Sequence, residues 1–266
     1  MPIRFGVDTT SGRIEFSLAL VPPQRLRPHE EVIPREVRKL TKSFTDLGIQ
    51  HDPIIVDEDT LTVLDGMHRL AATKALGIRN VLCMTIDYLN PAIRVDTWNR
   101  QFRGSPKVVA ELASRLSDRK LPTLRVVTAK QTETIVGEDM NALDSCKSFT
   151  KFIKEVEKLL GPETITASRI PVQGSFLLVP PLVSKEDIIN MAQIGTVLPP
   201  KSTRHVFPVR VLTASVPLNL MNSRLDPAEL NSALAAYFRK HDIVVGSGGL
   251  EYGGRKYEEE KLFFFA

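Results

Sequence analysis

The sequence is poor in cysteine and contains no long run of apolar residues. Its 266 residues include two cysteines, Cys83 and Cys146, which lie far apart and outside any metal-binding pattern. No zinc site or disulfide framework is therefore expected, which favours a reducing, cytoplasmic compartment. No stretch approaches the roughly 18 apolar residues of a membrane span, and the first residues lack the apolar core of a signal peptide. We therefore expect a cytoplasmic protein with no membrane partner.

The sequence also lacks a strong excess of charge of one sign. It has 35 Lys and Arg against 31 Asp and Glu, a formal net charge of +4, and its basic residues are spread along the chain. Spread charge indicates local anion sites more than a face for nucleic acid, which is not expected as a partner. Hydrophobic residues make up 42% and charged residues 25%, as in a globular chain that buries a core.

Strand-like and helix-like segments alternate from about residue 12 to residue 90, which predicts a mixed sheet covered by helices. Pro34 and Gly48 bracket a helix whose apolar residues, Val37 to Leu47, recur at helical spacing. Gly104 and Pro106 then break the chain, so we expect one domain over 1–105 and another over 106–266. The expected strands are 14–21, 53–56, 61–64, 81–86, 124–128, 132–136, 176–179 and 209–212, and the expected helices are 34–47, 67–77, 108–116, 147–160, 185–194 and 227–240.

The stretch LTVLDGMHRLAATKALG, residues 61–77, joins a strand to a helix through a short polar loop. We call its central part, Asp65-Gly66-Met67-His68-Arg69, the phosphate loop. The first N–H groups of a helix have no internal partner and the helix dipole adds positive charge there, so this geometry suits a phosphate. The simpler interpretation is that Asp65 caps the helix and that His68 and Arg69 are ordinary surface residues.

A second polar cluster follows Pro199 and Pro200. It offers cations and hydroxyl donors on a proline-stiffened loop, which suits a carboxylate or a phosphate, or else forms a basic surface loop. Its members are Lys201, Ser202, Thr203, Arg204 and His205. The only tryptophan, Trp98, is by residue type a core or interdomain anchor. The end of the chain, Phe263 to Phe265, is expected to pack on the body.

Four segments together resemble the free L-serine kinase family, whose nucleotide-binding domain is ParB-like. They are Arg27-Pro28-His29-Glu30, Asp65-Gly66-Met67-His68-Arg69, Thr97-Trp98 and Pro200-Lys201-Ser202-Thr203-Arg204-His205-Val206. The resemblance runs from about residue 20 to about residue 210 and is weak between 110 and 180. It implies an α+β fold: a ParB/sulfiredoxin-like N-terminal domain and a smaller mixed α/β C-terminal domain, with the active-site cleft between them.

The resemblance implies transfer of a phosphoryl group from ADP or ATP, with Mg²⁺, to the hydroxyl of free L-serine, giving O-phospho-L-serine. Carried over by position, Glu30 is the catalytic base, and Asp65, the magnesium ligand, acts with His68 and Arg69 at the phosphates. Ser43, Gly66 and Met67 are then implied at the nucleotide. The serine pocket is implied to contain Glu30, Trp98, Lys201, Ser202, Thr203, Arg204 and His205.

Met67 departs from the family pattern, since many members have His at this position. Methionine cannot bind a phosphate oxygen or share a proton, so either that histidine is dispensable or the donor or acceptor differs here. A kinase of the same fold for another hydroxyl metabolite, such as myo-inositol, and a ParB-like nucleotide-binding regulator remain alternatives. A sulfiredoxin-like reductase would need a reactive cysteine, whereas Cys83 falls in an expected strand and is expected to be buried and inert.

Overall fold

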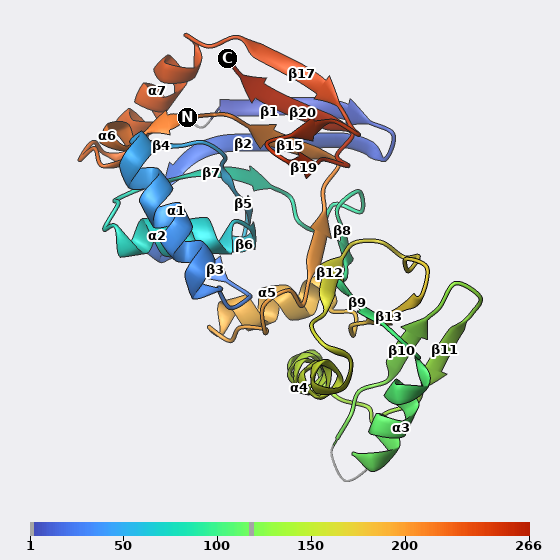
Figure 1. Cartoon of the computed structure of the whole chain (residues 1–266). Helices are drawn as coiled ribbons and strands as arrows, with labels where there is room; N and C mark the ends of the chain where they lie inside the picture. Colours follow the sequence, from blue (N-terminus) through green and yellow to red (C-terminus); the bar gives the residue numbers. More distant parts are fainter. Residues whose placement is uncertain (1–2, 117–119) are drawn as a thin grey trace. The chain divides into compact units, whose positions relative to one another are not determined.

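The chain folds into two compact units in a computed structural model that describes residues 3–116 and 120–266. The first unit contains the chain up to Arg94, Ile189–Thr196 and His205–Ala266, and the second contains Val95–Ile188 and Val197–Arg204. The chain passes from one unit to the other four times: within β8 (Arg94–Asp96), within α5 (Lys185–Gln193), between Thr196 and Val197, and within β14 (Arg204–Val206). Figure 1 labels most of the elements of both units.

The main sheet of the first unit mixes parallel and antiparallel pairs. Phe16, Leu18 and Leu20 alternate with more exposed residues along one strand, as expected for a strand with one buried face. In spatial order the sheet contains β1 (Ile3–Thr9), β2 (Gly12–Val21), β7 (Val81–Ile86), β5 (Ile54–Asp57), β6 (Thr62–Asp65) and β3 (Arg27–Pro28). The N-terminal arm is thus a hairpin, in which β1 was not among the expected strands.

Two helices of the first unit place the phosphate loop. Helix α1 (Pro34–Leu47) starts at its proline and ends where Gly48, at φ 67°, donates its N–H to Phe44 O. It packs on α2 (Met67–Ala75), which contacts β5. Phe44 is buried as predicted, whereas Leu47, in the last turn, is 53% exposed. The 3-10 turn η1 (Pro23–Arg25) contacts α2.

The C-terminal segment builds a second sheet of the first unit. Phe263 packs its ring against Phe5 and Phe16, with centroids 6.0 and 5.2 Å apart, so the end of the chain packs on the N-terminal hairpin as predicted. The elements are β15 (Val209–Leu212), β20 (Lys261–Phe265) and β17 (Ile243–Ser247) in this sheet, β16 (Val216–Pro217) paired with β4 (Ile49–Gln50), the β18 (Glu251–Tyr252) and β19 (Arg255–Lys256) hairpin, and α6 (Leu218–Met221) and α7 (Pro227–Phe238).

This segment explains why the units differ from the expected division at residue 105. Its strands pair with one another and with β4, and its aromatic side chains pack on the first residues, so 205–266 joins the N-terminal unit. These pairings link residues far apart in sequence, and no local break in composition marks them.

The second unit has its own antiparallel sheet and core. Phe102, Phe149, Phe152 and Phe176 lie in one buried cluster between the sheet and its helices. Helix α4 begins five residues before its expected start because Asn141 caps it, accepting a hydrogen bond from Asp144 N. In spatial order the strands are β11 (Thr132–Ile135), β10 (Leu124–Val127), β13 (Ser175–Val179), β9 (Asn99–Arg103) and β12 (Thr164–Thr166), and the helices are α3 (Lys107–Arg115) and α4 (Ala142–Leu160).

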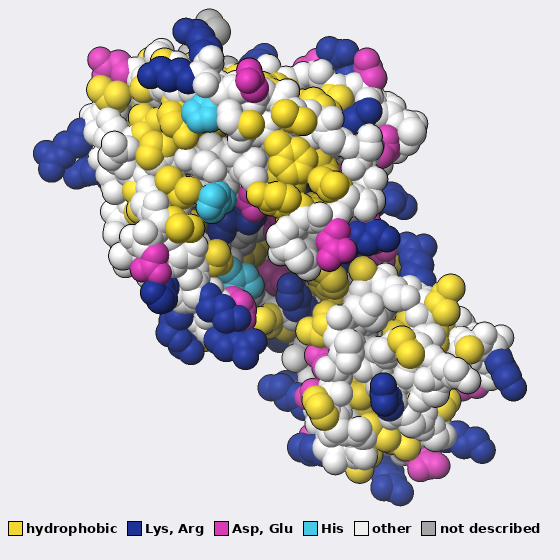
Figure 2. All heavy atoms as spheres, turned by 45° about the horizontal axis from the view of Figure 1, so that its top comes forward, with side chains coloured by type: hydrophobic (Ala, Val, Ile, Leu, Met, Phe, Trp, Pro, Cys, Tyr) yellow, Lys and Arg dark blue, Asp and Glu magenta, His cyan; other side chains and the backbone are white. Residues whose placement is uncertain are grey.

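Strand β17 exposes apolar side chains at the edge of the C-terminal sheet. Ile243, Val244 and Val245 are each more than 40% exposed, as is Tyr252 in the following hairpin. Figure 2, in which the C-terminal side comes forward, shows hydrophobic side chains in yellow on that side. Within the part of the chain that the structure describes, no helix combines the length and apolarity needed to cross a membrane.

Candidate functional site

The phosphate loop has the predicted strand, loop and helix arrangement. Strand β6 ends at Asp65, Gly66 takes φ 99°, and α2 begins at Met67. The N-cap is Gly66 and no side chain caps the helix, so the alternative in which Asp65 caps it is wrong. A Cβ on Gly66 would lie 3.0 Å from Arg69 Nε and 3.2 Å from Ile54 Cγ1, and these tight contacts together with the positive φ favour glycine at this position.

A pocket of about 440 Å³ in the first unit brings the predicted base and the start of α2 together. Glu30 reaches it from the segment between β3 and α1, and Met67 from the first turn of α2. Glu30 is half-buried and Met67 is buried. The full lining is Pro28, Glu30, Glu31, Val32, Met67, Leu70 and Ala71. A carboxylate thus shares one pocket with the apolar side chains of the first turns of α2, whereas Asp65, Gly66, His68 and Arg69 do not line it.

Asp65 is paired with two arginines. Arg210 Nη1 donates a short hydrogen bond to Asp65 Oδ2, and Arg69 Nη2 lies 3.5 Å from the same oxygen. Arg210 Nε in turn donates to Glu259 Oε1 at 2.5 Å. Burial alone would lower the pKa of Arg210, but the charges of Asp65 and Glu259 outweigh it and raise this pKa.

Arg69 also carries an unsatisfied donor. Its Nε is buried without a hydrogen-bond partner among the described residues, and its Nη1 lies 3.9 Å from Asp52 Oδ2. A guanidinium with an unused donor in the first turn of α2 is suited to an anionic ligand.

His68 connects the loop to the start of α1, and Ser43 lies on α1 itself. Ile33 N, at the start of α1, donates to His68 Nε2 at 2.9 Å, which assigns the proton of the neutral ring to Nδ1. Ser43 is half-buried on α1, the helix that packs on α2. His68 therefore has a structural contact in the place where the resemblance implied a phosphate group.

His29 and His205 form a small cluster with Tyr88 in the first unit. His29 is 1% exposed and its Nδ1 donates to Val63 O at 2.7 Å. Burial lowers the pKa of His29, although the charge of Glu30 and the carbonyl of Val63 oppose the shift. His205 Nε2 lies 2.8 Å from Tyr88 Oη, and its ring centroid is 5.3 Å from that of His29.

Trp98, Lys201 and Arg204 come together in the second unit. Lys201 Nζ lies 5.0 Å and Arg204 Cζ 5.6 Å from the Trp98 ring centroid, which are cation–π distances. Ser202 and Thr203 are buried, and the Ser202 hydroxyl donates to Pro199 O at 2.7 Å. The predicted polar cluster, residues 201–205, is therefore divided between the two units, since Lys201 to Arg204 belong to the second unit and His205 to the first.

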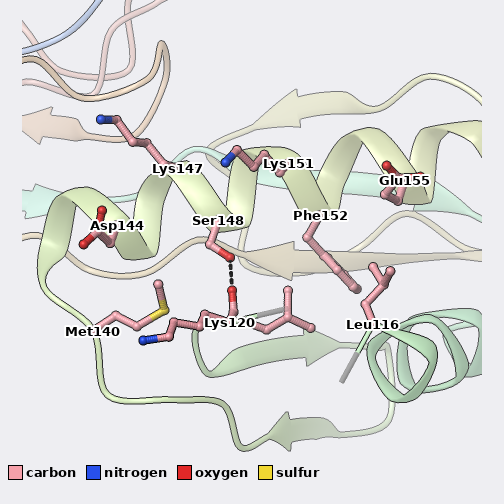
Figure 3. Close-up of a pocket in the computed structure, with 10 residues that line it drawn as sticks. Leu116, Lys120, Met140, Asp144, Lys147, Ser148, Lys151, Phe152 and Glu155 are labelled. Carbon is pink, nitrogen blue, oxygen red and sulfur yellow. Dashed lines mark hydrogen bonds between the residues drawn. The ribbon is translucent and has the colours of Figure 1, made fainter. Parts of the chain in front are cut away.

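A pocket of about 460 Å³ in the second unit contains none of the predicted site residues. Figure 3 shows that α4 supplies much of its lining, including Lys147, Lys151 and Phe152, and that Ser148 donates to the carbonyl of Lys120. This pocket is a feature of the α4 surface.

Arg210 and Glu259 were missed in the sequence. A lone arginine inside the apolar run Val209–Leu212 is the signal for Arg210, because a charge in a buried strand requires a partner. No local signal marks Glu259, which lies among other glutamates. Cys83 is buried as predicted, and burial raises the pKa of its thiol.

No family model matches the chain. An ATP-dependent L-serine kinase of Staphylothermus marinus is 27% identical over 75% of this chain and 89% of the relative. A ParB-like protein of Sulfolobus acidocaldarius is 29% identical over 72% of this chain and 92% of its own. The ADP-dependent L-serine kinase SerK of Thermococcus kodakarensis is 26% identical over 69% of this chain and 84% of its own.

Solved structures share the fold. SbnI of Staphylococcus aureus, truncated at its C-terminus, matches with a TM-score of 0.66 and 19% identity over 84% of this chain and 96% of its own. A mutant of free serine kinase in complex with ADP matches with a TM-score of 0.59 and 21% identity over 77% and 93%. The predicted α+β fold and the predicted resemblance are confirmed: this chain is similar to L-serine kinases in sequence and has the fold of free serine kinase.

Proposed function

We propose that this protein is a kinase that transfers a phosphoryl group from ATP or ADP to the hydroxyl of free L-serine. The product is O-phospho-L-serine. The observation that carries the proposal is the shared pocket of Glu30 and the N-terminal turn of α2. The names of two relatives, one ATP-dependent and one ADP-dependent, support serine as acceptor and leave both donors in the proposal.

The proposed roles follow from the chemistry of phosphoryl transfer. The serine oxygen forms a bond to phosphorus while the bond from phosphorus to the leaving nucleotide oxygen breaks, and Glu30 accepts the hydroxyl proton. The open N–H groups at the start of α2 and the unsatisfied Arg69 donor bind the phosphates. Lys201 and Arg204, beside Trp98, provide cations for the carboxylate of serine.

The residues of the phosphate loop could hold magnesium through a single carboxylate, provided that phosphate oxygens and waters supply the other ligands. Among the described residues no group of three or more His, Cys, Asp or Glu side chains could hold a metal ion. Magnesium at phosphates needs only one or two carboxylates, since phosphate oxygens and waters supply the other ligands. Asp65, whose Oδ2 is paired with Arg69 and Arg210 in this structure, is the side chain of the phosphate loop that would hold the ion, and the ion would neutralise phosphate charge.

Product analysis tests the proposal. The protein is incubated with ATP or ADP, magnesium and, separately, L-serine, myo-inositol and other hydroxyl metabolites, and the products are identified by mass spectrometry. We expect O-phospho-L-serine with L-serine. Phosphorylation of another metabolite alone would assign the site to that acceptor.

A nucleotide-binding regulator is the second candidate, because a ParB-like protein is among the relatives. It predicts nucleotide binding without any phosphorylated metabolite. The same incubation therefore separates the two candidates, provided that nucleotide binding is measured in parallel.

A further inference from the structure

The C-terminal segment reaches the phosphate loop through one buried arginine. Arg210, on β15, is 5% exposed and contacts Asp65 with Nη1 and Glu259 with Nε. Glu259 is 7% exposed and lies two residues before Lys261, the first residue of β20. A guanidinium held through two of its nitrogens by two carboxylates has a fixed plane, so its position on Asp65 depends on both partners.

The charge of this network matters at a site for anions. A carboxylate beside a helix N-terminus repels an incoming phosphate unless cations offset its charge. Asp65 has two such cations, Arg69 at 3.5 Å and Arg210 in direct contact. Arg210 is buried, so its guanidinium has little room to move. The contact with Glu259 therefore determines where the positive charge of Arg210 lies.

The position of Glu259 is itself held firmly. A Cβ on Gly248 would lie 2.5 Å from Glu259 O, so the turn after β17 approaches the Glu259 backbone closely. The next residue, Glu260, accepts hydrogen bonds from Thr10 N at 2.7 Å and Thr10 Oγ1 at 2.6 Å. Gly248, Glu260 and the β15–β20 pairing together anchor this stretch on the first unit.

We propose that Glu259 is a positioning residue of the nucleotide site: it holds Arg210 on Asp65 and so keeps the phosphate loop neutralised and oriented for phosphates. This inference rests on the proposed function in two ways: its effect on ADP affinity rests on nucleotide binding at the phosphate loop, and its effect on kcat rests on phosphoryl transfer. The C-terminal segment, which the resemblance to serine kinases did not cover, thereby contributes to the site from a residue that touches no substrate.

Glu259→Gln removes the charge while keeping the size of the side chain. We expect kcat for L-serine to fall about 10-fold, the low end for groups that orient a ligand-binding residue. KM for L-serine should stay the same, because Trp98, Lys201 and Arg204 are not altered. The affinity for ADP, measured by calorimetry with EDTA present, should fall by a similar factor. Glu251→Gln is the matched control, since Glu251 is exposed in the β18–β19 hairpin of the same segment, and should change neither value.

A double variant, Arg210→Met with Glu259→Leu, tests the proposal if Glu259→Gln unfolds. Replacing a buried ion pair by apolar residues is often neutral for stability. We expect a folded protein with weakened ADP binding and lowered kcat. Wild-type ADP affinity and kcat in either folded variant, with only a lowered melting temperature, would show a purely structural role and overturn the proposal.

The two proposals fail in different ways. A wild-type protein that binds ADP but phosphorylates nothing would remove the kinase, and the positioning role would then be decided by the ADP affinities of the variants. A wild-type protein that binds no ADP would overturn both.

Discussion

Gly66 is the position of the phosphate loop at which the backbone conformation most disfavours any residue with a side chain. It has φ 99°, and a Cβ there would lie 3.0 Å from Arg69 Nε. We expect Gly66→Ala to destabilise the fold by about 1–3 kcal/mol and to weaken nucleotide binding, because it strains the backbone and displaces the arginine. Calorimetric titration with ADP and thermal unfolding measure the two effects.

Gly77→Ala is the matched control for this prediction. Gly77 also has a positive φ, 64°, but a Cβ there meets nothing within 4 Å. It should lose stability and keep its nucleotide affinity. Equal ADP affinity in both variants would contradict the role given to the loop.

His29 predicts a dependence of stability on pH. Burial lowers its pKa in the folded state below the value of about 6.5 in the unfolded chain. Between these two values the unfolded chain binds more protons, so this contribution to stability is present above about pH 6.5 and is lost as the pH falls below it. Melting temperatures from pH 8 to pH 5 measure the effect.

The variant His29→Gln isolates this contribution. It should lose less melting temperature on acidification than the wild type, whereas His51→Gln, at an exposed histidine, should follow the wild type. The same loss of melting temperature in His29→Gln and wild type would show that other groups cause the acid sensitivity.

The C-terminal strand β20 is the element that makes the tail part of the first unit. Phe263 is 7% exposed and packs on Phe5 and Phe16. We expect Phe263→Ala to lower the free energy of unfolding by about 3–5 kcal/mol, since it empties a buried aromatic site. Chemical denaturation measures this value.

Phe264→Ala is the matched control on the same strand. Phe264 is half-exposed and its ring lies 5.6 Å from Tyr252. Phe264→Ala should lower the free energy of unfolding clearly less than Phe263→Ala does. An equal loss in the two variants would mean that β20 does not pack through Phe263 as described.

Elements whose ends or periodic pattern are marked by neighbouring residues were predicted from the sequence. Pro34 and Gly48 mark both ends of α1, and the phosphate loop was predicted from a strand, a polar loop and a helix in direct succession. Strands β1, β17 and β20 were not predicted as strands because their partners decide their structure, and β9 starts beside Trp98 without a periodic pattern. Such pairings are not encoded within a few neighbouring residues.

At the scale of the whole molecule, the candidate site likewise contains contacts that short stretches of sequence do not predict. Glu30 and the phosphate loop were predicted because the resemblance rests on short motifs. The Arg210 network joins residues 145 and 49 positions apart, and no motif spans such separations. Met67 is buried in the wall of the pocket that Glu30 also lines.

If Glu30 accepts the proton of L-serine in the pocket beside the phosphate loop, removing its carboxylate should stop the formation of product. The formation of O-phospho-L-serine is followed by ³¹P NMR with saturating nucleotide for the wild type, Glu30→Gln and the control Glu111→Gln, an exposed residue of α3. We predict formation by the wild type and the control, and a loss of about 100-fold or more in Glu30→Gln with unchanged nucleotide affinity. A Glu30→Gln variant that forms the product at the wild-type rate would show that Glu30 is not the base, and a wild type that forms none would show that the protein is not a serine kinase.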